Sequence, residues 1–102
     1  MDRQPVSGGE TTVARWRVRF FGRVQHVGFR YTAFYLAREL YLTGWVDNRE
    51  DGSVELEAQG RVSALRQLII RIKSKDHIRV DHMEVQEIEP VPYERKFEVR
   101  GY

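Results

Sequence analysis

Apolar and charged residues alternate strictly near the start of the sequence. From position 14 to position 20, every second residue is apolar and each residue between them is an arginine. The apolar residues are Ala14, Trp16, Val18 and Phe20, and the arginines are Arg15, Arg17 and Arg19. This period of two is typical of a strand with one buried face, so we predict a first strand here.

Two later stretches carry apolar residues at helical spacing. Residues 29–42 and 63–74 each place an apolar stripe along one side, which predicts two amphipathic helices. Thr43 and Gly44 mark the end of the first helix, and Ser63 is the expected N-cap of the second. Strand character returns at 45–46 and 54–59, across an Asp-Gly turn, and again at 79–88 and 96–101.

The predicted elements follow the order β-α-β-β-α-β, with a short extra strand at the C-terminal end. This is the ferredoxin-like arrangement, an α+β sandwich in which two helices cover one face of an antiparallel sheet. The other face must tolerate water, and the charged residues that alternate along the strands fit that requirement. We expect Glu55, Glu57 and Glu98 to lie opposite the arginines as cross-strand pairs.

Length and hydropathy limit the class of protein. The chain has 102 residues, enough for one domain with a single core and too few for two. Residues 1–11 are polar, so we expect a flexible tail followed by one domain over 12–102. No apolar run approaches the roughly 20 residues of a membrane span, and the N-terminal stretch lacks a hydrophobic block. We therefore expect a soluble, cytoplasmic monomer with no membrane partner.

The sequence contains no cysteine, which excludes disulfides, thiolate nucleophiles and cysteine-based metal sites. The three histidines, His26, His77 and His82, do not have metal-ligand spacing. We expect no metal and no cofactor. The net charge of +2 is slight and does not by itself indicate a nucleic-acid partner.

Between the first strand and the first helix lies the run GRVQHVGFR, from Gly22 to Arg30. Backbone N–H groups in a glycine-containing turn and at a helix N-terminus carry partial positive charge, and Arg30 adds a forked set of donors. A cation in a first helical turn is electrostatically misplaced unless an anion joins it. The residues alone predict a cradle for phosphate or carboxylate, with an ordinary turn and a surface arginine as the alternative.

Two stretches together resemble the signatures of the acylphosphatases. The first is the run that ends at Arg30, and the second is the segment 44–48, GWVDN, followed by Gly52, Val54 and Gly60 at the family's spacing. The resemblance covers about residues 14–102. It implies that the phosphate-binding loop consists of Gly22, Arg23, Val24, Gln25, His26, Val27, Gly28 and Phe29.

The resemblance also implies an activity. Acylphosphatases hydrolyse the carboxyl–phosphate bond of small acyl phosphates to a carboxylate and inorganic phosphate, without a metal. By that match, Arg30 binds the phosphoryl group of the substrate, or inorganic phosphate, together with the loop amides. Asn48 holds the attacking water, although its position beside a turn also suits a turn-stabilising side chain.

The sequence departs from the family pattern at two positions. His26 stands where the family usually has glycine, and a histidine with positive φ there would be strained by about 1–3 kcal/mol. The alternative is ordinary backbone with the imidazole at the rim of the cradle. Asp47 stands where a basic residue is common, and strand alternation predicts that its side chain points away from Asn48.

Two other functions compete with hydrolysis. One is a phosphate-binding module without turnover. The other is RNA binding by the row of arginines on the open sheet face. However, Trp16 and Phe20 fall on the apolar side of that strand, which leaves it no exposed ring for base stacking. We therefore expect a ladder of paired charges and no nucleic-acid partner.

Overall fold

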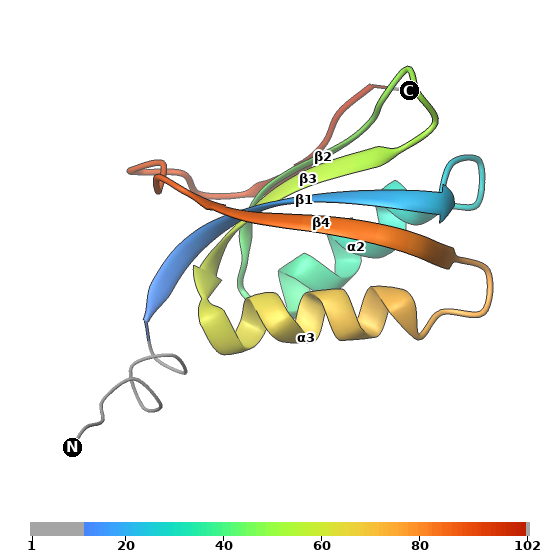
Figure 1. Cartoon of the computed structure of the whole chain (residues 1–102). Helices are drawn as coiled ribbons and strands as arrows, with labels where there is room; N and C mark the ends of the chain where they lie inside the picture. The colour runs from blue at the N-terminus through green and yellow to red at the C-terminus, as the bar shows by residue number, and fades with distance from the viewer. Residues whose placement is uncertain (1–11, 102) are drawn as a thin grey trace.

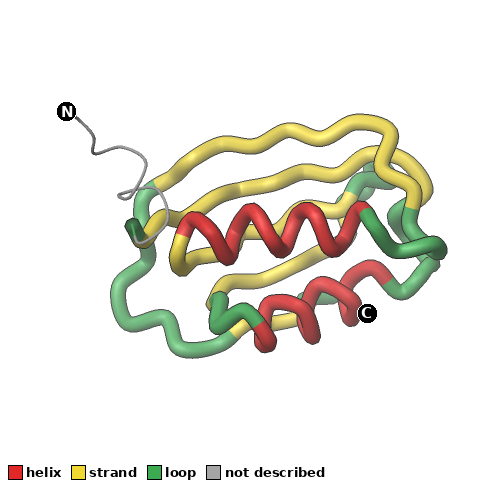
Figure 2. Tube along the Cα trace, turned by 90° about the horizontal axis from the view of Figure 1, so that it is seen from below, coloured by secondary structure: helices red, strands yellow, loops and turns green. Residues whose placement is uncertain are grey.

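The computed structural model describes residues 12–101, so the expected tail at 1–11 and Tyr102 lie outside the described residues. The strands are β1 (Val13–Arg23), β2 (Thr43–Asn48), β3 (Val54–Arg61), β4 (Arg79–Ile88) and β5 (Phe97–Val99), and the helices are α2 (Phe29–Glu39) and α3 (Val62–Lys73). Figure 1 shows both helices below the sheet, and Figure 2, seen from below, shows them in front of the strands. The predicted ferredoxin-like fold is confirmed.

The sheet has the strand order β4-β1-β3-β2-β5. The four long strands pair antiparallel, as predicted, whereas β5 pairs parallel with β2. Among residues 12–101, edge strand β4 has only β1 as a neighbour, and the other edge strand, β5, is three residues long. Because β2 and β3 form a hairpin beside β1, the loop after β1 and the end of β2 come to the same end of the sheet.

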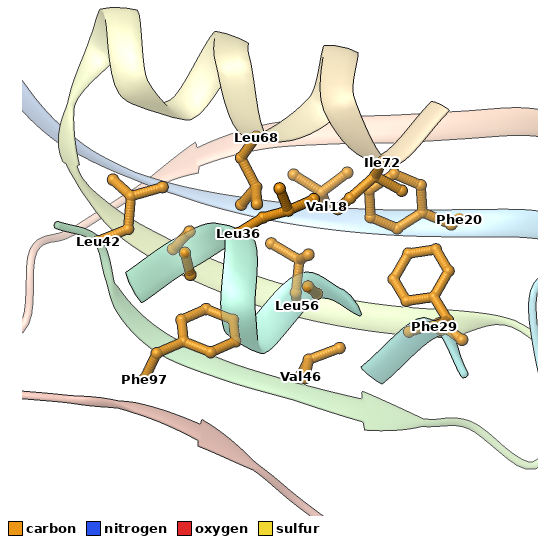
Figure 3. Close-up of a cluster of buried hydrophobic side chains, with 14 of the residues drawn as sticks. Val18, Phe20, Phe29, Leu36, Leu42, Val46, Leu56, Leu68, Ile72 and Phe97 are labelled. Carbon is orange, nitrogen blue, oxygen red and sulfur yellow. The ribbon is translucent and has the colours of Figure 1, made fainter. Parts of the chain in front are cut away.

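The core lies between the sheet and the two helices. Apolar side chains from every element except β4 are fully or almost fully buried there, and burial of each stabilises the fold by about 1.5–3 kcal/mol. Figure 3 labels ten of them: Val18, Phe20, Phe29, Leu36, Leu42, Val46, Leu56, Leu68, Ile72 and Phe97. The two apolar stripes read from the sequence therefore do face the sheet.

The open face of the sheet is less exposed than expected. Arg15 is only 2% exposed, because its guanidinium donates to Glu57 Oε1 at 2.8 Å and to Glu94 Oε1 at 2.8 Å. Glu94 belongs to the connection between β4 and β5. Gln59 also binds this connection, since its Nε2 donates to the Val91 carbonyl at 3.0 Å and its Oε1 accepts from the Val91 amide at 2.7 Å. That connection therefore crosses the face on which Arg15 lies.

The expected charge ladder is confirmed for β3 and wrong for β5. Arg17 lies opposite Glu57 and Arg19 opposite Glu55. Glu98 instead forms an ion pair with Lys96 at 3.4 Å, because β5 is separated from β1 by two strands. Arg15 and Arg17 are held by carboxylates, whereas the Arg19 Nε is buried with no hydrogen-bond partner among residues 12–101. Two of the three arginines are therefore engaged, so the row is not a continuous free basic surface for RNA.

The C-terminal end of α2 and the N-terminal end of α3 differ in detail from the prediction. Helix α2 stops at Glu39 rather than at 42, because Tyr41 adopts φ 58 and the Leu42 amide turns back to the Ala37 carbonyl at 2.9 Å. Helix α3 starts at Val62, directly after the extended residue Arg61, so Ser63 lies inside the helix instead of capping it. Neither helix within residues 12–101 is long and apolar enough to cross a membrane.

Candidate active site

The loop between β1 and α2 ends in an open helix N-terminus. Gly28, the N-cap of α2, has φ 80 and ψ 18, and no side chain of residues 12–101 caps the helix. The first turn contains no acidic residue either. The first amides of α2 therefore lack the partners that a capping side chain would provide, which leaves them available to an anion.

The entry to the loop requires glycine. Gly22 has φ 135, and a Cβ there would lie 2.8 Å from the Asp81 amide nitrogen of the neighbouring strand β4. The β1–β4 register shifts between Phe21 and Gly22, which marks a β-bulge, and the pairing continues to Arg23, opposite Arg79. The loop begins after Arg23, at the end of the sheet toward which α2 directs its N-terminus (Figure 1).

Arg30 and Asn48 line the same small hollow, of about 110 Å3, with Val24, His26 and Gly28 from the loop. Arg30 comes from the first turn of α2 and Asn48 from the last residue of β2. The hollow is well below the roughly 300–1,000 Å3 of sites for drug-sized ligands, so its size suits a compact anion. The structure thus brings together the two residues that the sequence singled out.

Each of these two side chains retains hydrogen-bonding capacity. Arg30 Nη1 donates to the Arg100 carbonyl at 2.6 Å, which uses one of the five guanidinium N–H groups. The Asn48 side chain makes no hydrogen bond to any residue in 12–101. A fixed guanidinium beside an unpaired carboxamide can hold an anion and a water molecule next to each other.

Gln25 has a role that the sequence did not reveal. Its Nε2 donates to the Arg49 carbonyl at 2.7 Å and to the Ser53 carbonyl at 2.8 Å. These bonds tie the loop to the turn that follows Asn48, so they fix the distance between the two halves of the site. The only signal in the sequence was a lone carboxamide among apolar and basic loop residues.

His26 adopts φ 63, so the strained alternative of the two considered for this position is the one observed. The imidazole is exposed at the rim of the hollow. The Asp47 carboxylate lies 3.6 Å from Nη1 of Arg49, which follows the last residue of β2. It does not line the hollow, in contrast to Asn48.

The turn of the β2–β3 hairpin, which follows Asn48, contains the carboxyl group of Asp51. The Ser53 hydroxyl and the Ser53 amide both donate to Asp51, which holds the pKa of that carboxyl below its usual range. Asp51 is therefore a turn residue that stays ionised, and it does not line the hollow. No group of three or more potential metal ligands comes together within the described part of the chain.

Comparison with known proteins identifies relatives along most of the chain. The family model described as Acylphosphatase matches residues 16–99. An acylphosphatase of Geobacillus thermodenitrificans is 40% identical over 79 residues, covering 76% of this chain and 84% of that protein. One of Bacillus licheniformis is 38% identical over 86 residues, covering 83% of this chain and 96% of its own length.

A solved structure agrees with these sequence matches. The crystal structure of acylphosphatase from Bacillus subtilis superposes with a TM-score of 0.80 at 33% identity, covering 88% of this chain and all of that one (100%). The family match, the relatives and the shared fold therefore agree, and this chain belongs to the acylphosphatase family.

Proposed function

We propose that this acylphosphatase hydrolyses small acyl phosphates without a metal, with Arg30 and the loop amides holding the phosphoryl group and Asn48 holding the attacking water. The observation that supports this most directly is the shared hollow. A guanidinium from α2 and an unpaired carboxamide from β2 line it beside an uncapped helix N-terminus.

Charge neutralisation is the first task of the site. An acyl phosphate is a mixed anhydride whose phosphoryl oxygens carry two negative charges, and these must be balanced as water approaches. Arg30 keeps four N–H donors after its bond to the Arg100 carbonyl, and the first amides of α2 add preorganised dipoles. Removal of one such donor typically raises a reaction barrier by about 3–4 kcal/mol.

Water placement is the second task. The Asn48 carboxamide can accept from and donate to one water, which would aim the water oxygen at phosphorus opposite the leaving carboxylate. The new P–O bond forms as the bond between phosphorus and the acyl oxygen breaks. The electron pair of the broken bond leaves with the carboxylate, and the water proton passes to a phosphoryl oxygen, giving inorganic phosphate.

No protein acid or base is needed in this scheme. A carboxylate is a stable leaving group and does not require protonation as it departs. The lining of the hollow agrees with this scheme, because none of its residues is an aspartate or glutamate. The metal-free course of the reaction is part of the proposal.

Hydrolysis of benzoyl phosphate, followed by its loss of absorbance in excess chelator, tests the assignment. Arg30→Gln should lower kcat by about 100-fold or more and also weaken inhibition by inorganic phosphate. Asn48→Ala should lose turnover to a similar extent while phosphate inhibition stays near the wild-type value. Arg66→Gln, an exposed arginine on α3, is the matched control and should change neither.

Two results would overturn the roles. An Asn48→Ala variant with undiminished hydrolysis would remove the water-positioning role. An Arg30→Gln variant that is still inhibited by phosphate as strongly as the wild type would show that the anion binds elsewhere.

We also propose that the enzyme acts as a cytoplasmic monomer. The absence of cysteine means that the fold needs no oxidising compartment. Sedimentation equilibrium should give the mass of one chain at concentrations at which hydrolysis is proportional to protein. Fractionation of the source cells should recover the activity with the cytoplasm.

A further inference from the structure

A second, larger hollow lies at the opposite end of α2 from the active site. Its volume is about 520 Å3, and it lies where the last turn of α2, the link to β2 and the start of β5 meet. The residues that characterise it are Phe34, Arg38, Tyr41, Arg95, Lys96 and Phe97, and we call it the aromatic–cation hollow. An eleven-residue helix is about 16 Å long, so this hollow is separate from the one at Arg30.

The lining combines rings and positive charge without any carboxylate. Three of its side chains are aromatic, three are cationic, and no aspartate or glutamate is among the lining residues. The Arg38 guanidinium lies over the Phe34 ring, 5.6 Å from its centroid. Arg38 and Arg95 form no ion pair with any residue in 12–101, whereas Lys96 lies 3.4 Å from Glu98. The hollow therefore offers two uncompensated guanidinium groups beside aromatic surface.

Tyr41 is the unusual residue of this hollow. It occupies the position after the C-cap of α2, where its own amide donates to the Arg38 carbonyl at 3.1 Å and the next amide donates to Ala37. Glycine is the usual residue there because the position requires a left-handed backbone, which Tyr41 adopts with φ 58. Tyr41 as a whole is 91% exposed, so the strain is not offset by burial. A strained residue that presents a bare ring to a hollow points to a ligand for that ring.

We propose that the aromatic–cation hollow binds a small ligand that joins a planar aromatic ring to a phosphate, as a nucleoside monophosphate does. The ring would stack on Tyr41 and Phe34, since aromatic side chains accept any planar base on their faces. The phosphate would pair with the guanidinium groups of Arg38 and Arg95, whose planar donor arrays match phosphate oxygens. The volume lies within the range that holds a single ligand of that size.

Chemical-shift titration of the full-length, 15N-labelled chain with AMP tests the proposal. Ribose 5-phosphate is the matched probe, because it carries the phosphate without the ring and should reach only the cradle at 24–30. AMP should shift the cradle amides and also, saturably, the amides at 38–43 and 95–97. If millimolar AMP shifts no amides beyond those that ribose 5-phosphate shifts, the proposal is wrong.

Two tyrosine-to-glycine variants distinguish the contribution of the Tyr41 ring to binding from an effect on folding. Tyr41→Gly suits the left-handed backbone, so it should fold normally, keep benzoyl phosphate hydrolysis and lose at least about fivefold in AMP affinity at 38–43. Tyr93→Gly is the matched control, because Tyr93 also has positive φ, at 66, and is 91% exposed but does not line the hollow. It should leave AMP affinity unchanged. Equal AMP affinity in wild type and Tyr41→Gly would overturn the role of the ring.

Loss of charge gives an independent readout. The double variant Arg38→Gln, Arg95→Gln should weaken AMP binding at the hollow and reduce its dependence on salt concentration, because the phosphate would lose its two guanidinium partners. Unchanged affinity and salt dependence would contradict the proposed phosphate contact. Neither arginine lines the active-site hollow, so hydrolysis serves as the internal control.

Discussion

Replacement of His26 by glycine should stabilise the protein without loss of activity. A left-handed backbone is unfavourable for an L-residue by about 1–2 kcal/mol, and His26 adopts it with φ 63. Glycine removes that strain but gains freedom in the unfolded chain, which offsets about 0.4–1 kcal/mol. The imidazole is exposed and makes no hydrogen bond within residues 12–101, so little else is lost. The net gain is about 0.5–1 kcal/mol.

Thermal and urea unfolding of wild type and His26→Gly measure this gain. For a domain of this size, about 0.5–1 kcal/mol corresponds to a rise in Tm of about 2–8 °C. Hydrolysis of benzoyl phosphate should stay the same or increase, because the loop amide keeps its direction. His26→Ala is the control, since it removes the imidazole but leaves a Cβ at positive φ, and its stability should stay close to that of wild type.

Two outcomes would refute the reasoning. A His26→Gly variant less stable than His26→Ala would show that the backbone at this position is not strained in solution. A large loss of hydrolysis in both variants would show that the imidazole takes part in the reaction directly.

Three further changes test other parts of the structure. Gly44→Ala should destabilise by about 3 kcal/mol or more in urea unfolding, because its Cβ would lie 2.8 Å from the Glu57 carbonyl carbon at φ 140. Gln25→Ala should lower kcat/KM for benzoyl phosphate by about tenfold or more, since the loop would lose both bonds to the hairpin turn. Glu57→Gln should destabilise the protein by about 1.5–3 kcal/mol at pH 7, because the buried Arg15 guanidinium loses one of its two carboxylate partners and keeps the other, Glu94. Burial alone would raise the pKa of Glu57, but hydrogen bonds from Arg15 and Arg17 outweigh it and lower that pKa. The carboxylate therefore stabilises fully above its ordinary value of 4.5, and the difference between wild type and Glu57→Gln should close as the pH falls below that value.

For each of these three predictions, one result would contradict the physical reason given. For Gly44→Ala, the control is Gly52→Ala. Gly52 also has positive φ, at 93, but a Cβ added there would meet no atom within 4 Å, so equal destabilisation by the two changes would exclude a steric cause. For Gln25, an unchanged kcat/KM would mean that the hairpin turn does not position the loop. For Glu57, a stability difference that stays constant from pH 7 to pH 3 would exclude the charge as its origin.

The element order could be predicted because period and turn chemistry are local. The alternation in β1 and the apolar stripe of α3 each reflect contact with one core, and β4 runs over the predicted range. Tyr41 shows the limit of such reasoning. A sequence pattern treats glycine as the stop signal of a helix, whereas here a tyrosine takes the left-handed conformation because the Schellman hydrogen bonds hold it.

Long-range placement was the other source of error. Arg15 was expected in water, and its burial depends on Glu94, 79 positions away in the sequence. Glu98 was expected opposite the arginines of β1. It lies in β5, two strands away from β1, and pairs with Lys96 instead, because periodicity does not encode the order of strands in a sheet. At the site, Arg30 and Asn48 could be named from their motifs, but the anchoring by Gln25 depends on where the hairpin turn lies in space.

The free edge of β4 has a consequence for behaviour at high concentration. Within residues 12–101, one edge of β4 is unpaired over ten residues, and such an edge is a template on which another chain can add a strand, the first step of aggregation. This edge strand carries Asp81, Glu84 and Glu87 against a single cation, Arg79, so two copies that meet edge to edge repel each other.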